Sequence, residues 1–298
     1  MYDQAQSLRD IVKKSDHEVL EAVKAERPQP LTKIITITSG KGGVGKSSVT
    51  VNLALALSQM GLRILIIDAD FGLANIDVML GMPSRYNLSH LLKKERALHE
   101  IVQQWHDSIY YISGGSGIRE LLHMNEAQVA KIIDGALDLP EPVDIILCDT
   151  GAGVNDMIIS LAAASTEVLL VTTPEPTAIL DAYALLKTLY QEDEAPQAWL
   201  IMNKAVSAKE AENAIVSFVR ITDKYLNQQI EPIGSILYDD DMAKSIKQQT
   251  PLMLSQPKSI TARNFLSIAQ ALLQKPAEQK TVGPLAKLFS RWISVHKH

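Results

Sequence analysis

The chain has 298 residues, 46% hydrophobic and 21% charged, which fits one large or two small globular domains. Its net charge of −5, from 29 basic and 34 acidic residues, gives no overall basic surface for nucleic acid, so direct nucleic-acid binding is not expected. The single cysteine, Cys148, excludes an intrachain disulfide and any C-x-x-C metal or redox motif. Because Cys148 lies in an apolar run, we expect it to be buried.

The N-terminal region predicts a helix followed by a linker. Residues 3–25 have the apolar spacing of an amphipathic helix, with Asp3 as a candidate N-cap. Two prolines within residues 26–32 then favour an extended segment. The predicted first region is therefore residues 1–32, a helix that either docks on a partner or covers the domain that follows.

Residues 33–274 alternate apolar strands with helices. The expected strands are 33–39, 62–68, 109–112, 143–149, 167–173, 198–203 and 232–237. Their near-continuous Val, Ile and Leu runs suit a sheet that helices cover on both faces. The sequence thus predicts an α/β domain with a doubly wound, mainly parallel sheet.

Residues 40–47, GKGGVGKS, match the phosphate-binding pattern G-x-x-x-x-G-K-S/T, between a strand and the helical pattern of residues 47–60. The glycines let the backbone turn and point its N–H groups at phosphates, and the helix start adds a positive dipole end. We expect Lys46 to contact the β- and γ-phosphates and Ser47 to bind Mg²⁺. The predicted nucleotide-binding residues of this P-loop are Gly40, Lys41, Gly42, Gly43, Val44, Gly45, Lys46, Ser47 and Ser48.

Polar side chains follow three further strands. Asp68 and Asp70 end one strand, and Asp149 ends another. Because ligands of such sheets bind at the carboxyl ends of strands, these aspartates can hold Mg²⁺ directly or through water, or orient an attacking water. We assign Asp68 and Asp149 to the metal site with Ser47. A helix N-cap is the alternative role for each aspartate taken alone. Asn203 offers a donor and an acceptor to an adenine edge, although asparagine is also a common turn residue.

Three segments together, residues 41–47, 68–75 and 149–153, resemble the MinD/ParA family of deviant Walker A ATPases, over roughly residues 33–274. Within that family the chain is similar to the FlhG (FleN) branch of MinD-like regulators of flagellar number. The closer resemblance rests on a short N-terminal motif, by which that branch engages and activates the FlhF GTPase. The residues that match this motif are Asp3, Gln4, Ala5, Leu8 and Arg9.

The resemblance implies an ATP- and Mg²⁺-dependent homodimer, in which Lys41 reaches the phosphates that the partner subunit binds. A cation supplied in this way by GTPase partners accelerates hydrolysis by about 10³–10⁵-fold. Asp70 is then the residue that positions the attacking water, and hydrolysis is slow because it times a switch. Lys41 and Asp70 are thus the expected catalytic residues. The resemblance also implies a FleQ-type transcription regulator as a partner.

The C-terminal region, residues 275–298, predicts a linker and an amphipathic helix. Basic residues lie opposite its apolar face, which suits a helix lying on an anionic membrane surface. MinD-type tails support this interpretation, and a terminal helix packed on its own domain is the alternative. The apolar face consists of Leu285, Leu288, Phe289, Trp292 and Ile293.

The predicted protein is a regulatory ATPase switch that is cytoplasmic and reversibly peripheral at the inner face of the cell membrane. No signal peptide and no apolar stretch of the ~18 residues that cross a bilayer occurs in the sequence. The alternatives are a ParA/MinD-like ATPase for DNA partitioning or division-site positioning, and an ATP-dependent ligase. DNA partitioning requires a basic DNA-binding face, and a ligase requires a substrate site of which the sequence has no sign. Too few cysteines are present for an iron–sulfur protein.

Overall fold

The computed structural model describes residues 32–70, 75–93, 95–115, 143–192, 195–226, 228 and 230–275, without the side chains of Asn75 and Leu92. The helix predicted at residues 3–25, its partner-binding motif and the C-terminal helix lie outside the described residues. The boundaries of the three predicted regions therefore stay predictions.

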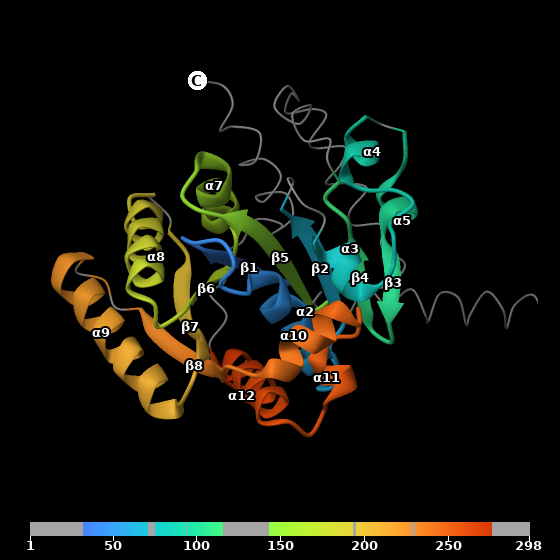
Figure 1. Ribbon diagram of the computed structural model, residues 1–298. Coiled ribbons are helices and arrows are strands. Elements are labelled where there is room, and N and C mark those ends of the chain that lie inside the picture. The colour runs from blue at the N-terminus through green and yellow to red at the C-terminus, as the bar shows by residue number, and fades with distance from the viewer. Residues whose placement is uncertain are drawn as a thin grey trace, which may run out of the picture. The chain divides into compact units, whose positions relative to one another are not determined.

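One mixed sheet organises the described residues (Figure 1). Its strand order is β3-β4-β2-β5-β1-β6-β7-β8, and all neighbours are parallel except β3 and β4. The strands are β1 (Lys33–Ser39), β2 (Ile64–Ala69), β3 (Gln103–His106), β4 (Ile109–Ile112), β5 (Ile145–Ala152), β6 (Glu167–Thr172), β7 (Gln197–Ala205) and β8 (Glu231–Leu237). The doubly wound, mainly parallel fold is confirmed.

Strand β3 was not predicted from the sequence. All seven expected strands are present, with ends shifted by at most a few residues. The additional strand β3 pairs antiparallel with β4 at the edge of the sheet, and a turn at Asp107 and Ser108 joins the two strands. Its sequence QQWH is mostly polar, and none of its residues is fully buried. Because an edge strand needs no continuous apolar run, hydrophobic patterning gave no signal for it.

Helices cover both faces of the sheet, as Figure 1 shows. On one face lie α2 (Lys46–Ser58), α3 (Asn75–Leu80), α10 (Asp240–Lys247), α11 (Leu252–Ser255) and α12 (Ile260–Gln274). On the other lie α4 (Leu88–Leu92), α5 (Leu98–Ile101), α7 (Asp156–Ala164), α8 (Pro176–Leu189) and α9 (Ala208–Leu226).

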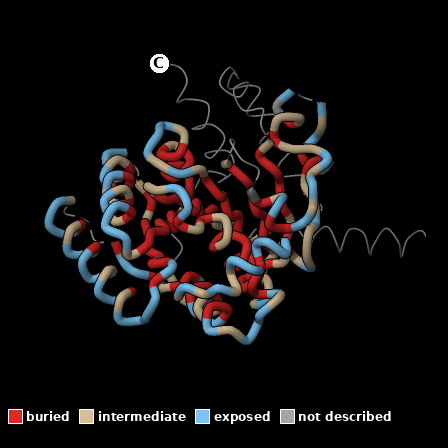
Figure 2. The backbone as a smooth tube through the Cα atoms, viewed as in Figure 1, coloured by how far each residue is buried: buried red, intermediate tan, exposed pale blue. Residues whose placement is uncertain are grey.

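The strands form the buried centre of the domain (Figure 2). Side chains of β1 alternate between the two helix layers, with Ile35 and Ile37 on the α2 side and Ile34 on the opposite side. Helix α2 is buried continuously from Val49 to Leu57, including the polar Thr50 and Asn52, so the end of the P-loop is anchored in the core. Cys148 is fully buried as expected, and burial raises the pKa of its thiol to about 12. No helix within the described residues is long and apolar enough to span a bilayer.

Candidate nucleotide-binding site

The P-loop turns tightly between β1 and α2 because three of its positions require glycine. Gly43 and Gly45 have φ angles of 75° and 97°, which side chains disfavour. At Gly40 a Cβ atom would run into the carbonyl oxygen of Asp181 in α8. The loop is therefore fixed at its base against α8 and at its end by the start of α2.

Lys46 places a buried cation beside the loop. Its side chain is 7% exposed and its Nζ donates to Ser39 Oγ at 2.8 Å. Burial lowers the pKa of Lys46, while the charges of Asp149 and Asp70 act in the opposite direction. Lys46 also lines the cavity described below. Its predicted contact with the β- and γ-phosphates stays a prediction.

Ser47 and Asp149 form a candidate Mg²⁺ position. Ser47 Oγ donates to Asp149 Oδ2 at 2.6 Å, and Thr50 Oγ1 donates to Asp149 Oδ1 at 3.1 Å. Burial raises the pKa of Asp149 to about 6 against the hydrogen bond from Ser47 and the charge of Lys46. Because the Ser47 hydroxyl gives its hydrogen to Asp149, its lone pairs stay available for a cation.

The donor set fits a cation that shares its coordination with a nucleotide. Within the described residues no cluster of three or more His, Cys, Asp or Glu side chains could hold a metal ion alone. Mg²⁺ characteristically takes one or two protein ligands and completes its shell with phosphate and water oxygens. Ser47, supported by Asp149, would hold such an ion, which would neutralise phosphate charge.

Asp68 and Asp70 occupy different positions, although they are two residues apart. Asp68 pairs in register with Asp149, and burial together with that neighbouring charge raises the pKa of Asp68 to about 8. Its carboxylate accepts from the backbone N–H groups of Asp70 at 3.0 Å and Ile76 at 3.3 Å. Asp68 thus holds the backbone at Asp70 and at Ile76, and Asp70 itself lines the cavity near Gly151. The predicted metal contact of Asp68 stays a prediction.

The second lysine of the P-loop, Lys41, lies outside the cavity. Its Nζ donates to Glu175 Oε2 at 2.7 Å and to Thr177 Oγ1 at 2.9 Å, at the start of α8. Its side chain is 36% exposed, and the interaction lowers the pKa of Glu175. Lys41 is not among the residues that line the cavity, whereas its neighbour Gly42 is.

Asn203 contacts the P-loop. Its Nδ2 donates to the carbonyl oxygen of Val44 at 2.7 Å, and its Oδ1 accepts from the backbone N–H of Lys204 at 2.9 Å. In this structure the side-chain amide therefore holds the loop. The predicted contact of Asn203 with adenine stays a prediction.

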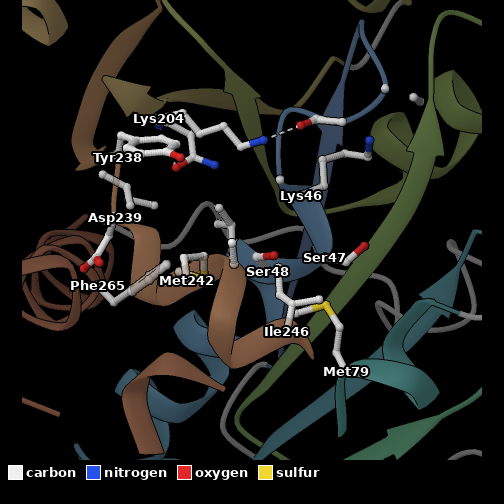
Figure 3. Close-up of a pocket in the computed structure, with 18 of the residues that line it drawn as sticks. Lys46, Ser47, Ser48, Met79, Lys204, Tyr238, Asp239, Met242, Ile246 and Phe265 are labelled. Carbon is white, nitrogen blue, oxygen red and sulfur yellow. Dashed lines mark hydrogen bonds between the residues drawn. The ribbon is translucent and has the colours of Figure 1, made fainter. Parts of the chain in front are cut away.

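A cavity of about 770 Å³ joins these groups (Figure 3). This volume lies in the usual range for small-molecule sites. One part is lined by the P-loop, and another by Tyr238, Asp239 and Met242, which follow β8. This second part of the cavity was not predicted from the sequence. Polar residues were recognised at four strand ends but not at the end of β8, although Tyr238 and Asp239 directly follow that strand.

The fold and the site define a P-loop nucleoside triphosphatase with a second lysine in its loop. A family model described as "ParA: NUBPL iron-transfer P-loop NTPase" matches residues 30–273. The chain belongs to this ParA family and is a P-loop ATPase of the MinD/ParA type, as its motifs predict.

Two curated relatives match most of the chain. The antiactivator FleN of Pseudomonas aeruginosa is 33% identical over 87% of this chain and 93% of its own length. The flagellum site-determining protein YlxH of Helicobacter pylori is 32% identical over 82% and 83%, respectively.

Solved structures share the fold. MinD of Pyrococcus horikoshii, complexed with Mg-ADP, matches with a TM-score of 0.66 and 24% identity, over 82% of this chain and 96% of that one. A MinC:MinD complex of Aquifex aeolicus matches with a TM-score of 0.69 and 24% identity, over 85% and 100%.

Proposed function

We propose that this ATPase is a MinD-like switch that forms a homodimer with Mg²⁺ and ATP and controls the number or placement of flagella. In the dimer, Lys41 of each subunit contacts the phosphates bound by the other. Asp70 positions the attacking water. ATP hydrolysis then returns the protein to its monomeric state.

The position of Lys41 is the observation that carries the dimer. A lysine that served its own nucleotide would face its own cavity, as Lys46 does. Lys41 is instead partly exposed on the surface, where its Nζ donates to the exposed side chains of Glu175 and Thr177 at the start of α8. The Mg-ADP complex of the Pyrococcus horikoshii relative supports Mg²⁺ with an adenine nucleotide as the ligand.

The names of the relatives support the flagellar role. One is an antiactivator and the other a flagellum site-determining protein. The proposed partners are an FlhF-type GTPase, bound through residues 3–9, and a FleQ-type transcription regulator. The C-terminal helix at residues 285–298 binds the inner face of the cell membrane. Two helices on one dimer bind more tightly than one because the second event is intramolecular.

The partner assignment is tested by deleting residues 1–25. The truncated chain should hydrolyse ATP as the full chain does but should no longer stimulate an FlhF GTPase. A second variant, Gln4→Ala/Leu8→Ala, keeps the full length of the chain. Like the deletion, it should hydrolyse ATP normally but fail to stimulate the FlhF GTPase. Full stimulation by either variant would refute the role of residues 3–9.

The membrane assignment is tested by sedimentation with anionic liposomes. Asp70→Ala, which retains ATP, should sediment more with ATP than with ADP, and Phe289→Glu/Trp292→Glu should abolish sedimentation with both. Equal binding with ADP and ATP would contradict a membrane interaction that depends on dimerisation. An ATP-dependent, salt-sensitive shift of DNA would favour the partitioning function instead.

A further inference from the structure

Ser39 joins three segments of the site, although it does not line the cavity. It is the last residue of β1, directly before the P-loop, and it is fully buried. Its Oγ accepts from Lys46 Nζ at 2.8 Å and donates to the carbonyl oxygen of Lys41 at 2.7 Å. Its own carbonyl oxygen accepts from the backbone N–H of Gly153 at 3.0 Å. One residue therefore contacts both lysines of the P-loop and the loop that follows β5.

The two hydrogen bonds of the Ser39 hydroxyl use different parts of the group. A serine hydroxyl has one hydrogen to donate and two lone pairs that accept. Because its hydrogen goes to the carbonyl oxygen of Lys41, Ser39 receives Lys46 through a lone pair. Lys46 can therefore leave Ser39 while the bond to Lys41 stays in place.

The contact between Lys46 and Ser39 lies where a phosphate would compete for the ammonium group. Within the part of the chain that the structure describes, Ser39 Oγ is the one hydrogen-bond partner of Lys46 Nζ. A buried ammonium group needs an acceptor, and Ser39 supplies it. A charged phosphate oxygen is a stronger acceptor than a neutral hydroxyl. A polyphosphate over the P-loop should therefore draw Lys46 away from Ser39.

The bond to the carbonyl oxygen of Lys41 restrains the backbone from which that side chain leaves the loop. Gly40, before Lys41, is packed against α8, but Gly42, after it, has no side chain that restricts the backbone. The hydrogen bond from Ser39 supplies a restraint at this point of the loop. It thereby helps to set the direction of the partly exposed Lys41 side chain.

Irregular strand pairing keeps Ser39 itself in place. The register between β1 and β5 shifts between Ile37 and Ser39, so that Ser39 lies opposite Ala152. Gly153, which donates to the Ser39 carbonyl oxygen, has a φ of 99°. Irregular pairing of this kind is common next to active sites, where it redirects groups of the strand. Because Ala152 lines the cavity, Ser39 is attached to the cavity wall and cannot follow Lys46 toward a phosphate.

We propose that Ser39 is a positioning residue with opposite effects on the two lysines. It competes with bound phosphate for Lys46, and it holds the backbone of Lys41 so that the Lys41 side chain is directed out of its own subunit. The second effect rests on the proposed homodimer, in which Lys41 reaches the phosphates of the partner subunit, whereas the first does not. Loss of the hydroxyl should therefore tighten phosphate binding by the monomer and weaken the dimer formed with ATP.

Calorimetric titration with Mg²⁺ and inorganic pyrophosphate measures the first effect. Ser39→Ala removes the competing acceptor and should bind pyrophosphate about three- to tenfold more tightly than wild type. Ser39→Cys should do the same, because its thiol is a weak acceptor of similar size, which separates the role of the hydroxyl from that of its volume. Ser39→Thr keeps the hydroxyl and should bind within about twofold of wild type.

Light scattering over a range of protein concentrations, in Mg²⁺ and ATP, measures the second effect. The substitutions are combined with Asp70→Ala, which the proposed switch keeps as an ATP-bound dimer. Ser39→Ala/Asp70→Ala should require about tenfold more protein to dimerise than Asp70→Ala, because each dimer has lost the restraint on two copies of Lys41. Ser39→Thr/Asp70→Ala should dimerise like Asp70→Ala.

Ser58→Ala is the matched control for the loss of a serine hydroxyl. Ser58 ends α2, with its Oγ 2.9 Å from Ser108 Oγ, and it does not line the cavity. Its substitution should leave the pyrophosphate affinity as in wild type and the dimer as in Asp70→Ala.

Three results would overturn the proposal. Unchanged or weaker pyrophosphate binding by Ser39→Ala would remove the competition for Lys46, and an unchanged dimer would remove the restraint on Lys41. Weakening in both assays would indicate a general loss of structure, which thermal melts of all variants detect. If Asp70→Ala alone stays monomeric with ATP, the homodimer and the second effect fail together, whereas the pyrophosphate titration still decides the first effect.

Discussion

Lys41 and Lys46 lie five positions apart in one loop but in opposite environments. Lys46 is buried beside Ser39, and the nearby charges of Asp149 and Asp70 act to raise its pKa against the effect of burial. Lys41 is partly exposed and bound to Glu175 and Thr177 on the surface. One lysine belongs to the cavity of its own subunit, and the other does not.

This difference separates a fixed part of the site from an exchangeable one. Buried, hydrogen-bonded charges are costly to move because a broken contact leaves a desolvated group unpaired. Exposed ion pairs contribute little to stability and are easily replaced. In the proposed dimer, Lys41 would leave Glu175 for a phosphate that the second subunit binds.

The largest effect is expected at the fixed lysine. Lys46→Met should reduce ATP turnover by about 100-fold or more and remove most nucleotide affinity, because the buried cation facing the phosphates is lost. Titration with a fluorescent ATP analogue measures the affinity. Lys41→Met, the control in the same loop, should bind the analogue within about twofold of wild type. Normal affinity in Lys46→Met would invalidate the distinction between the two lysines.

A second test addresses how the loop is fixed near Lys41. Gly40→Ala places a methyl group against the Asp181 carbonyl of α8 and should destabilise the protein by about 1–3 kcal/mol. Urea denaturation measures the loss. At Gly61, with a φ of 86° and no atom within 4 Å of a Cβ, alanine should cost only the backbone strain, about 1 kcal/mol. Equal losses at both sites would show that α8 does not fix the loop.

The buried carboxylates predict a pH effect on the Mg²⁺-free protein. The pKa values of Asp68 and Asp149 are raised to about 8 and about 6, so the folded protein binds more protons than the unfolded chain. Stability should therefore be full below the ordinary aspartate pKa and fall as pH rises through these values, by about 1.4 kcal/mol per pH unit for each carboxyl that only the folded protein keeps protonated.

Thermal unfolding between pH 5 and pH 9 in EDTA measures this effect. Asp68→Asn, which imitates the protonated carboxyl, should flatten the curve between pH 6 and 8. The surface variant Asp156→Asn should leave the slope unchanged. A wild-type protein that becomes more stable across this range would contradict the assignment of raised pKa values.

The smallest effect is expected at the exchangeable contact. Glu175→Gln removes the charge that holds Lys41, but the pair is exposed and lies outside the cavity. The melting temperature and the affinity of the monomer for ATP should therefore stay as in wild type. Scanning calorimetry and analogue titration measure both. A change of affinity above about threefold would place the pair in the monomer's own site.

The parts of this molecule that depend on local sequence pattern could be predicted from the sequence. Spacing alone identified the P-loop, and apolar runs identified seven strands, because a buried parallel sheet requires them. The buried Asp149 was found for the same reason, since it directly follows such a run.

The missed features depend on contacts between distant segments. Lys41 and Glu175 are 134 residues apart, and Lys204, whose Nζ donates to the carbonyl oxygen of Gly43, is 161 residues from that glycine. A register change between β7 and β8 has no signature in one strand, so nothing in the sequence marked Lys204. The polar edge strand β3 is stabilised by pairing with β4 and not by its composition.

The most direct test of the proposed switch compares Asp70→Ala with Asp70→Ala/Lys41→Ala by size-exclusion chromatography with light scattering, in Mg²⁺ with ATP or ADP. Asp70→Ala should be a dimer with ATP and a monomer with ADP. The double variant should stay monomeric with both nucleotides while its affinity for ATP is unchanged. A double variant that still dimerises with ATP would contradict the account, because Lys41 would then have no part in joining the subunits.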